Sequence, residues 1–84
     1  MKLTYAAEAK KELVEAAKYY ENCKPGLGQA FLREVESATE VIIENPKRWR
    51  RIKGEFRRYL LRRFPYGIIY LATAQEVFVA AIML

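Results

Sequence analysis

The sequence predicts an α+β fold in which a helical hairpin packs on one face of a small antiparallel sheet. In the first half of the chain, apolar residues recur with a helical period of about 3.6 residues. After residue 55 the pattern changes to the alternation of strands, and short connections favour antiparallel neighbours. The predicted order is therefore β-α-α-β-β-β, and 84 residues fit one domain covering residues 1–84.

The first half is predicted to hold one short strand followed by two helices. Lys2–Tyr5 is short and partly alternating, as expected for a strand. Glu8–Glu21 carries an apolar stripe at helical spacing, and the Pro and Gly of Asn22–Gly26 end that helix. Gly28–Glu44 repeats the stripe until Asn45-Pro46 stops it. A link of about five residues makes the two helices an antiparallel hairpin.

The second half is predicted to hold three strands after a basic loop. Phe56–Arg63 alternates as a strand with arginine on both of its faces. Phe64–Tyr66 is a turn or bulge, because proline does not sit in a central strand. Gly67–Ala72 and Val77–Met83 are apolar strands, and Thr73–Glu76 is the tight connection between them.

Composition excludes several kinds of chemistry. The chain has no histidine and no aspartate, which removes Ser-His-Asp and Cys-His catalysis, His-ligated zinc and an Asp-based magnesium site, so we expect no metal and no cofactor. Its one cysteine, Cys23, cannot form an internal disulfide, and the first residues lack the apolar run of a signal peptide. The uncharged stretches Phe64–Gln75 and Val77–Leu84 are shorter than the roughly 20 residues of a membrane helix. We therefore expect a cytoplasmic protein without a membrane span.

Positive charge is concentrated between residues 47 and 63, which hold nine of the fifteen Lys and Arg residues against Glu55 alone. Such a cluster favours an acidic partner, either nucleic acid or an acidic protein segment, over a merely solvated surface. The candidate binding residues are Arg48, Arg50, Arg51, Lys53, Arg57, Arg58, Arg62 and Arg63. Trp49 lies among them and is either a stacking platform or a cap on the core. We favour the cap, with the arginines reaching outward.

The order of these elements, with the residues in them, resembles the RelE/ParE superfamily, whose members are the toxins of type II toxin–antitoxin pairs. The resemblance covers nearly the whole chain and is closest over Arg57–Tyr70. The form Arg-Arg-Phe-Pro-Tyr at residues 62–66 is more similar to the ParE branch. The other matching segments are Glu12-Leu13, Ala16-Ala17, Tyr19-Tyr20-Glu21, Gly26-Leu27-Gly28, Phe31-Leu32, Val35, Asn45-Pro46 and Arg48-Trp49.

The RelE branch cleaves messenger RNA on the ribosome, and the resemblance indicates which positions would carry that activity. Gly67 stands where those nucleases have an arginine, and Leu60 stands where they have a lysine, whereas Arg58 keeps the match. The nucleases carry further Arg and Tyr after the last strand, and the sequence ends at Leu84. Attack of a ribose hydroxyl on phosphate needs cations together with an acid and a base. We therefore predict that the nuclease site is largely dismantled.

The resemblance to the ParE branch implies a toxin that binds and inhibits DNA gyrase, is neutralised by a cognate antitoxin and serves plasmid stabilisation. One alternative is a RelE-like, ribosome-dependent endoribonuclease that would use Arg58, Arg62, Arg63 and Tyr66. Another is an inactive scaffold that binds only antitoxin, because family members commonly continue into a basic, aromatic tail. Direct binding of nucleic acid is a secondary hypothesis. A disordered acidic antitoxin segment could fold into a groove or onto a sheet edge.

Overall fold

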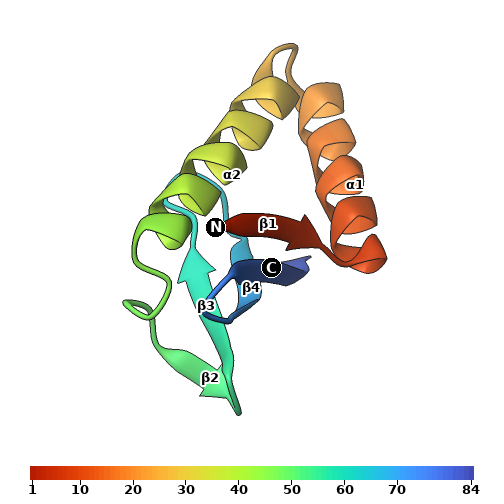
Figure 1. Ribbon diagram of the computed structural model, residues 1–84. Coiled ribbons are helices and arrows are strands. Elements are labelled where there is room, and N and C mark those ends of the chain that lie inside the picture. Colours follow the sequence, from red (N-terminus) through yellow and green to blue (C-terminus); the bar gives the residue numbers. More distant parts are fainter.

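A computed structural model describes residues 1–84, with two helices and five strands. The elements are β1 (Lys2–Tyr5), α1 (Ala7–Cys23), α2 (Leu27–Glu44), β2 (Arg51–Lys53), β3 (Phe56–Leu60), β4 (Gly67–Ala72) and β5 (Glu76–Met83). The strands form one sheet in the order β1-β5-β4-β3-β2. Figure 1 shows α1 and α2 as a hairpin beside this sheet, which confirms the predicted α+β fold.

The sheet differs from the prediction in three respects. Strands β3 to β5 are antiparallel as predicted, and β2 is also antiparallel to β3, but β1 pairs in parallel with β5, so the sheet is mixed. The pair joins Leu3 to Val77, and no local pattern indicates a pairing so distant in sequence. The basic loop contains β2, a three-residue strand with a bulge and no apolar alternation to predict it. Strand β3 ends at Leu60 and not at the predicted Arg63, because the Leu61 N–H donates to the Tyr66 carbonyl and closes a turn.

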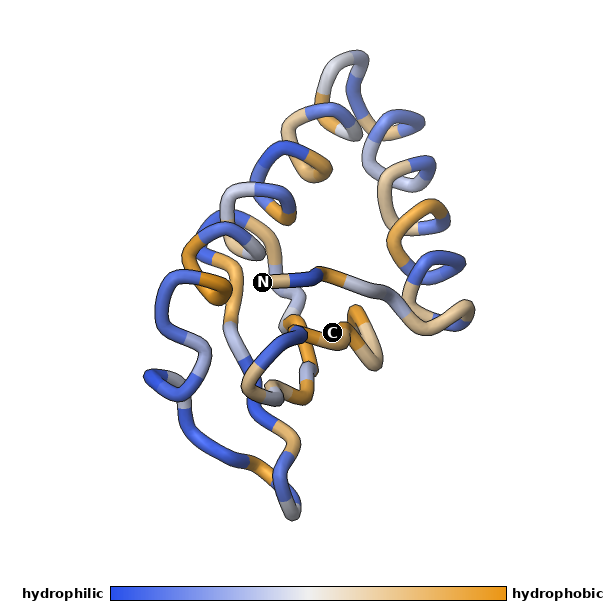
Figure 2. Tube along the Cα trace, viewed as in Figure 1, coloured by the Kyte–Doolittle hydropathy of each residue, from blue (hydrophilic) through white to orange (hydrophobic).

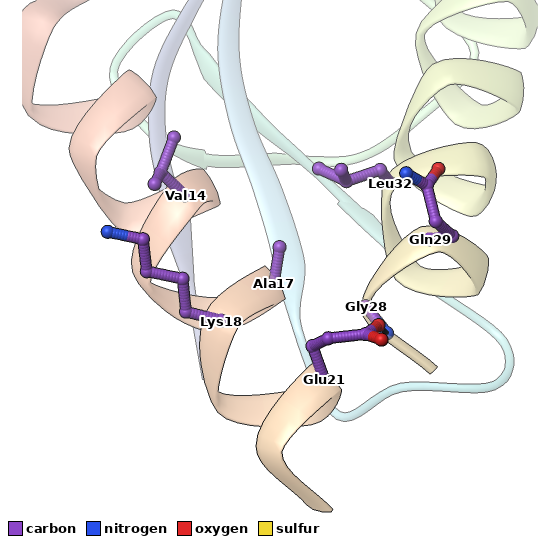
Figure 3. A pocket seen from close by; sticks show the side chains of 7 residues that line it. All are labelled: Val14, Ala17, Lys18, Glu21, Gly28, Gln29 and Leu32. Carbon is purple, nitrogen blue, oxygen red and sulfur yellow. Dashed lines mark hydrogen bonds between the residues drawn. The ribbon is translucent and has the colours of Figure 1, made fainter. Parts of the chain in front are cut away.

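The junction between the helices is fixed by a glutamate and two glycines. Gly26 precedes α2 in a left-handed conformation with φ 88°, which favours glycine. The Glu21 carboxylate accepts the backbone N–H of Gly26 at 2.9 Å and of Gly28 at 3.0 Å, so it caps α2 from the previous helix. Figure 3 shows Glu21 reaching toward Gly28 across the groove between the helices. A Cβ on Gly28 would lie 2.5 Å from the Ala17 carbonyl oxygen, so only glycine allows this approach.

The core lies between the helices and one face of the sheet. An aromatic group closes the end of this core near the hairpin turn, where the rings of Tyr20 and Phe31 both pack against Phe64 and Tyr66. The largest fully buried side chains are Tyr70, Phe31, Ile42, Ile68, Ile82, Val35, Val77 and Val79. Figure 2 shows hydrophilic residues predominating along the segment from the end of α2 to β2.

Tyr70 ties β4 to the segment that follows α2. Its hydroxyl donates to the Pro46 carbonyl at 2.6 Å, so the phenol is buried without an unsatisfied polar atom. Burial raises the pKa of Tyr70 above its usual value, and the nearby positive charge of Arg57 offsets only part of that rise. Tyr70 and Ile68 are both buried, and Tyr66 packs against the same core.

Candidate functional site

The basic residues that the sequence singled out follow β2 and β3 but do not form one patch. Arg50, Arg51 and Lys53 lie on or next to β2, at the end of the molecule away from the helical hairpin turn (Figure 1). Arg62 and Arg63 lie beyond the other end of β3. Arg63 lines a separate cleft of about 210 Å³ with residues 24–27 of the turn between the helices. Two basic groups therefore flank β3.

The two arginines of β3 have opposite surroundings. Arg57 pairs with the buried Tyr70, so it lies on the face that the helices cover. Its guanidinium donates to the Lys47 carbonyl at 3.2 Å and to the Trp49 carbonyl at 2.7 Å. Arg57 therefore holds the connection after α2 in place. Arg58 points to the opposite, uncovered face of the sheet, so the prediction of arginine on both faces is confirmed.

A cleft on the uncovered face gathers part of the basic cluster. Its volume is about 280 Å³, and it is lined by Trp49, Arg50, Ile52, Arg58 and Leu60. Leu60 is 61% exposed and Ile52 is 43% exposed, so large apolar side chains stand beside the two cations. The five side chains are an indole, two guanidinium groups and two aliphatic chains. The cleft can bind an anionic and partly apolar partner, but its lining offers no acid–base pair for proton transfer.

The register of β3 against β4 brings together positions 58, 60 and 67, at which the resemblance to the RelE branch implies cations. Leu60 lies directly opposite Gly67. A Cβ on Gly67 would lie 3.2 Å from Cγ and 3.3 Å from Cδ of Arg58, so the arginine extends across the glycine. Arg58 is thus the only cation at these positions. Tyr66 is turned away, with its ring packed against Phe31 at a centroid distance of 5.3 Å.

The basic side chains also differ in the contacts that they make within the protein. Arg51 forms the only ion pair of the protein, with Glu55 at 3.2 Å. The guanidinium of Arg48 lies over the Trp49 ring, and that of Arg63 lies over Phe64. The Trp49 ring packs edge-on against Tyr59 at 5.0 Å, so it caps the core as predicted. The side chains of Arg50, Lys53, Arg58 and Arg62 have no hydrogen bond or ion pair within the protein.

The sequence did not predict the roles of two glutamates, Glu34 and Glu21, that hold backbone segments in place. Glu34 on α2 accepts the backbone N–H of Arg62 at 2.7 Å and of Arg63 at 3.1 Å, so it holds the turn that carries both arginines. Glu21 has the same role at the start of α2. The partners of Glu34 are 28 and 29 residues away and those of Glu21 lie at the start of the next helix, and a glutamate on a helix surface gives no sequence signal of either contact.

Comparison with known families identifies the chain. Residues 3–83 match the model of the ParE toxin of the type II toxin–antitoxin system parDE. The chain belongs to the ParE toxin family. The toxin is similar to a chain of the chromosomal ParDE system from P. aeruginosa, with a TM-score of 0.84, 16% identity, and coverage of 99% of this chain and 94% of that one. The resemblance to the RelE/ParE superfamily is thereby confirmed.

The toxin is also similar to a chain of the intact E. coli RelBE toxin–antitoxin complex. The TM-score is 0.73 at 18% identity, with 98% of this chain and 93% of that one covered. At these identities both structures show a shared fold. A comparison with curated protein sequences finds no significant match. Neither helix of the toxin is long and apolar enough to cross a membrane.

Proposed function

We propose that this toxin acts by binding and inhibiting DNA gyrase, and that a cognate antitoxin neutralises it. The observation that carries the proposal is that Arg58 is the only cation among positions 58, 60 and 67. Its side chain extends across Gly67, next to the exposed Leu60. Phosphodiester cleavage needs several cations and a proton donor and acceptor around the reacting phosphate. Guanidinium groups beside apolar side chains, with no acid–base pair among them, are suited to binding instead.

The chemistry of the uncovered face supports a protein as the target. Arg58 and Arg50 present rigid, multidentate donors that match carboxylates, and Leu60 and Ile52 add exposed apolar surface between them. Arginine surrounded by apolar side chains is typical of the residues that dominate protein–protein affinity. The partner that fits is a protein segment with acidic groups and at least one apolar side chain.

The proposal of a cognate antitoxin rests on membership of the ParE toxin family. The similar chains come from systems described as ParDE and RelBE, each named as a toxin with its antitoxin. An acidic segment of the antitoxin would compete with the target for the candidate binding residues, from Arg48 to Arg63. Its binding would also add buried surface to a small domain and so raise the toxin's stability.

The test is a gyrase supercoiling assay with the purified toxin, with and without the protein encoded next to it. The toxin should block supercoiling, and the neighbouring protein should restore it. Arg58→Gln should raise the inhibitory concentration about tenfold, the equivalent of about 1.4 kcal/mol. The matched control Lys11→Gln removes the same charge from an exposed site on α1 and should leave inhibition unchanged.

Three results would contradict this function. Unimpeded supercoiling at high toxin concentration, together with growth arrest that the neighbouring protein relieves, would establish a toxin with another target. Cleavage of ribosome-bound messenger RNA that disappears in Arg58→Gln would make the protein a nuclease of the RelE type. Tight binding of the neighbouring protein without any growth arrest would instead indicate an inactive scaffold.

A further inference from the structure

Residues 50–58 form a two-stranded ribbon, here called the basic ribbon. It contains β2, the turn after β2 and the first three residues of β3. Strand β2 is the outer strand of the sheet and pairs only with β3. Figure 1 shows the ribbon extending to the end of the molecule opposite the turn between α1 and α2. The molecule measures 39 Å along its longest axis and 21 Å across, so this end stands well away from the helical hairpin turn.

The basic ribbon presents cations on both of its faces. Arg50 and Arg58 lie on the uncovered face of the sheet, where both line the same cleft. Arg51 pairs with Arg57 and therefore lies on the other face. Lys53 is exposed next to the turn. Arg50, Lys53 and Arg58 have no intramolecular partner, and the exposed Arg51–Glu55 pair is a weak contact that an incoming phosphate can replace.

Within the ribbon itself the distribution of charges favours a polyanion, because Leu60, the more exposed apolar side chain of the neighbouring cleft, lies outside residues 50–58. Ile52 is the only largely exposed apolar residue of the ribbon, whereas tight protein partners need buried apolar anchors. Cations on two opposite faces suit a ligand that surrounds the ribbon on both sides. The walls of a nucleic acid groove, each lined with phosphates, have this arrangement.

The shape of the ribbon indicates which kind of nucleic acid it can bind. The major groove of B-form DNA is about 12 Å wide and admits a two-stranded β-ribbon, whereas the major groove of A-form RNA is too narrow for side chains to read. A single strand would need free aromatic rings for stacking, but Trp49 is already packed against Tyr59. We propose that the basic ribbon binds duplex DNA directly, by phosphate contacts and without gyrase.

The number of available cations sets the expected salt dependence. Arg50, Arg51, Lys53 and Arg58 can each neutralise one phosphate, whereas Arg57 is engaged by backbone carbonyls. Four contacts predict a slope of about −3.6 for log K against log salt concentration. Affinity should then fall about 150-fold between about 50 and about 200 mM salt.

The experiment is fluorescence anisotropy of a short labelled DNA duplex titrated with the toxin alone over this salt range. The variant Arg50→Gln/Lys53→Gln removes two ribbon cations and should reduce the slope by about two. The control Lys11→Gln/Lys18→Gln removes two cations from exposed sites on α1 and keeps the same net charge as the variant. The control should bind like the unmodified toxin. Thermal unfolding of both variants verifies that they fold.

Several results would overturn the proposal. The proposal fails if the toxin does not bind the DNA duplex at about 50 mM salt, or if the variant and the control lose affinity for DNA equally. It also fails if the toxin binds duplex RNA of the same sequence more tightly than DNA. Loss of gyrase inhibition in the ribbon variant, without any binding of DNA, would assign the ribbon to a protein partner instead. Because gyrase is absent from the titration, failure of the DNA contact is separate from failure of the proposed target.

Discussion

Replacing Gly28 by alanine sets two effects of opposite sign against each other. Alanine in a helix is more favourable than glycine by about 1 kcal/mol, which would stabilise α2. Yet the new Cβ would lie 2.5 Å from the Ala17 carbonyl oxygen and 3.0 Å from Cβ of Glu21. The carbonyl is part of the α1 backbone, so it can yield only if the two helices separate.

The structure indicates that the steric effect is the larger one. Overpacking of this kind costs about 1–3 kcal/mol. The added methyl group also lies 3.0 Å from Oε1 of Glu21, so it would disturb the carboxylate that caps α2, at a further cost of about 1 kcal/mol. After subtraction of the helix propensity, Gly28→Ala should destabilise the protein by about 2 kcal/mol. For a chain of this size the midpoint of thermal unfolding should fall by about 8–16 °C.

Circular dichroism melting of Gly28→Ala tests this reasoning, with Gln29→Ala as the matched control. Gln29 is exposed on the same turn of α2, so its replacement should change stability by less than about 0.5 kcal/mol. A rise in the midpoint of Gly28→Ala by the amount expected from helix propensity would refute the close approach of α1 and α2.

Three further outcomes follow from individual contacts. Glu34→Ala removes the acceptor of the Arg62 and Arg63 amides and should cost about 1–2 kcal/mol in denaturant unfolding, while affinity for duplex DNA stays unchanged because both residues lie outside the basic ribbon. Tyr70→Phe leaves the Pro46 carbonyl without its donor and should cost about 1 kcal/mol. Because the pKa of Tyr70 is raised on folding, its stabilisation is complete below the usual tyrosine pKa of about 10 and declines as the pH rises through the folded-state pKa. The loss of stability above that pH should be smaller in Tyr70→Phe than in the unmodified toxin, and an equal loss would contradict the assignment.

The spacing of apolar residues predicted most helices and strands, because each of them packs one face against a shared core. The bounds of β1 and β4 agree with the prediction, the first a short, partly alternating segment and the second an apolar run. Helix α1 extends from Ala7 to Cys23, slightly beyond the predicted Glu8–Glu21, because alanine and cysteine at its ends carry no stop signal. The three-residue β2 was missed because pairing with β3 defines it, and its own sequence does not.

The candidate site was predictable in composition but not in arrangement. The sequence concentrates cations between residues 47 and 63, but it gives no means of dividing them between the basic ribbon and the turn at Arg62. Alternation placed arginines on both faces of β3 without assigning the faces. A shift of one residue in register would exchange Arg57 with Arg58. Only the tertiary contacts of Arg57 with the Lys47 and Trp49 carbonyls fix which of the two is free to bind.

The same register explains how one fold can serve two activities. Positions 58, 60 and 67 converge because Leu60 lies opposite Gly67 and the Arg58 side chain extends across that glycine, and this geometry depends on strand pairing rather than on side-chain chemistry. Similarity of the backbone to chains of both a ParDE and a RelBE system is therefore compatible with either activity. Under the proposed function, the side chains at these positions decide between the two activities. Leucine and glycine there remove cations without disturbing the core, since both positions face away from the helices.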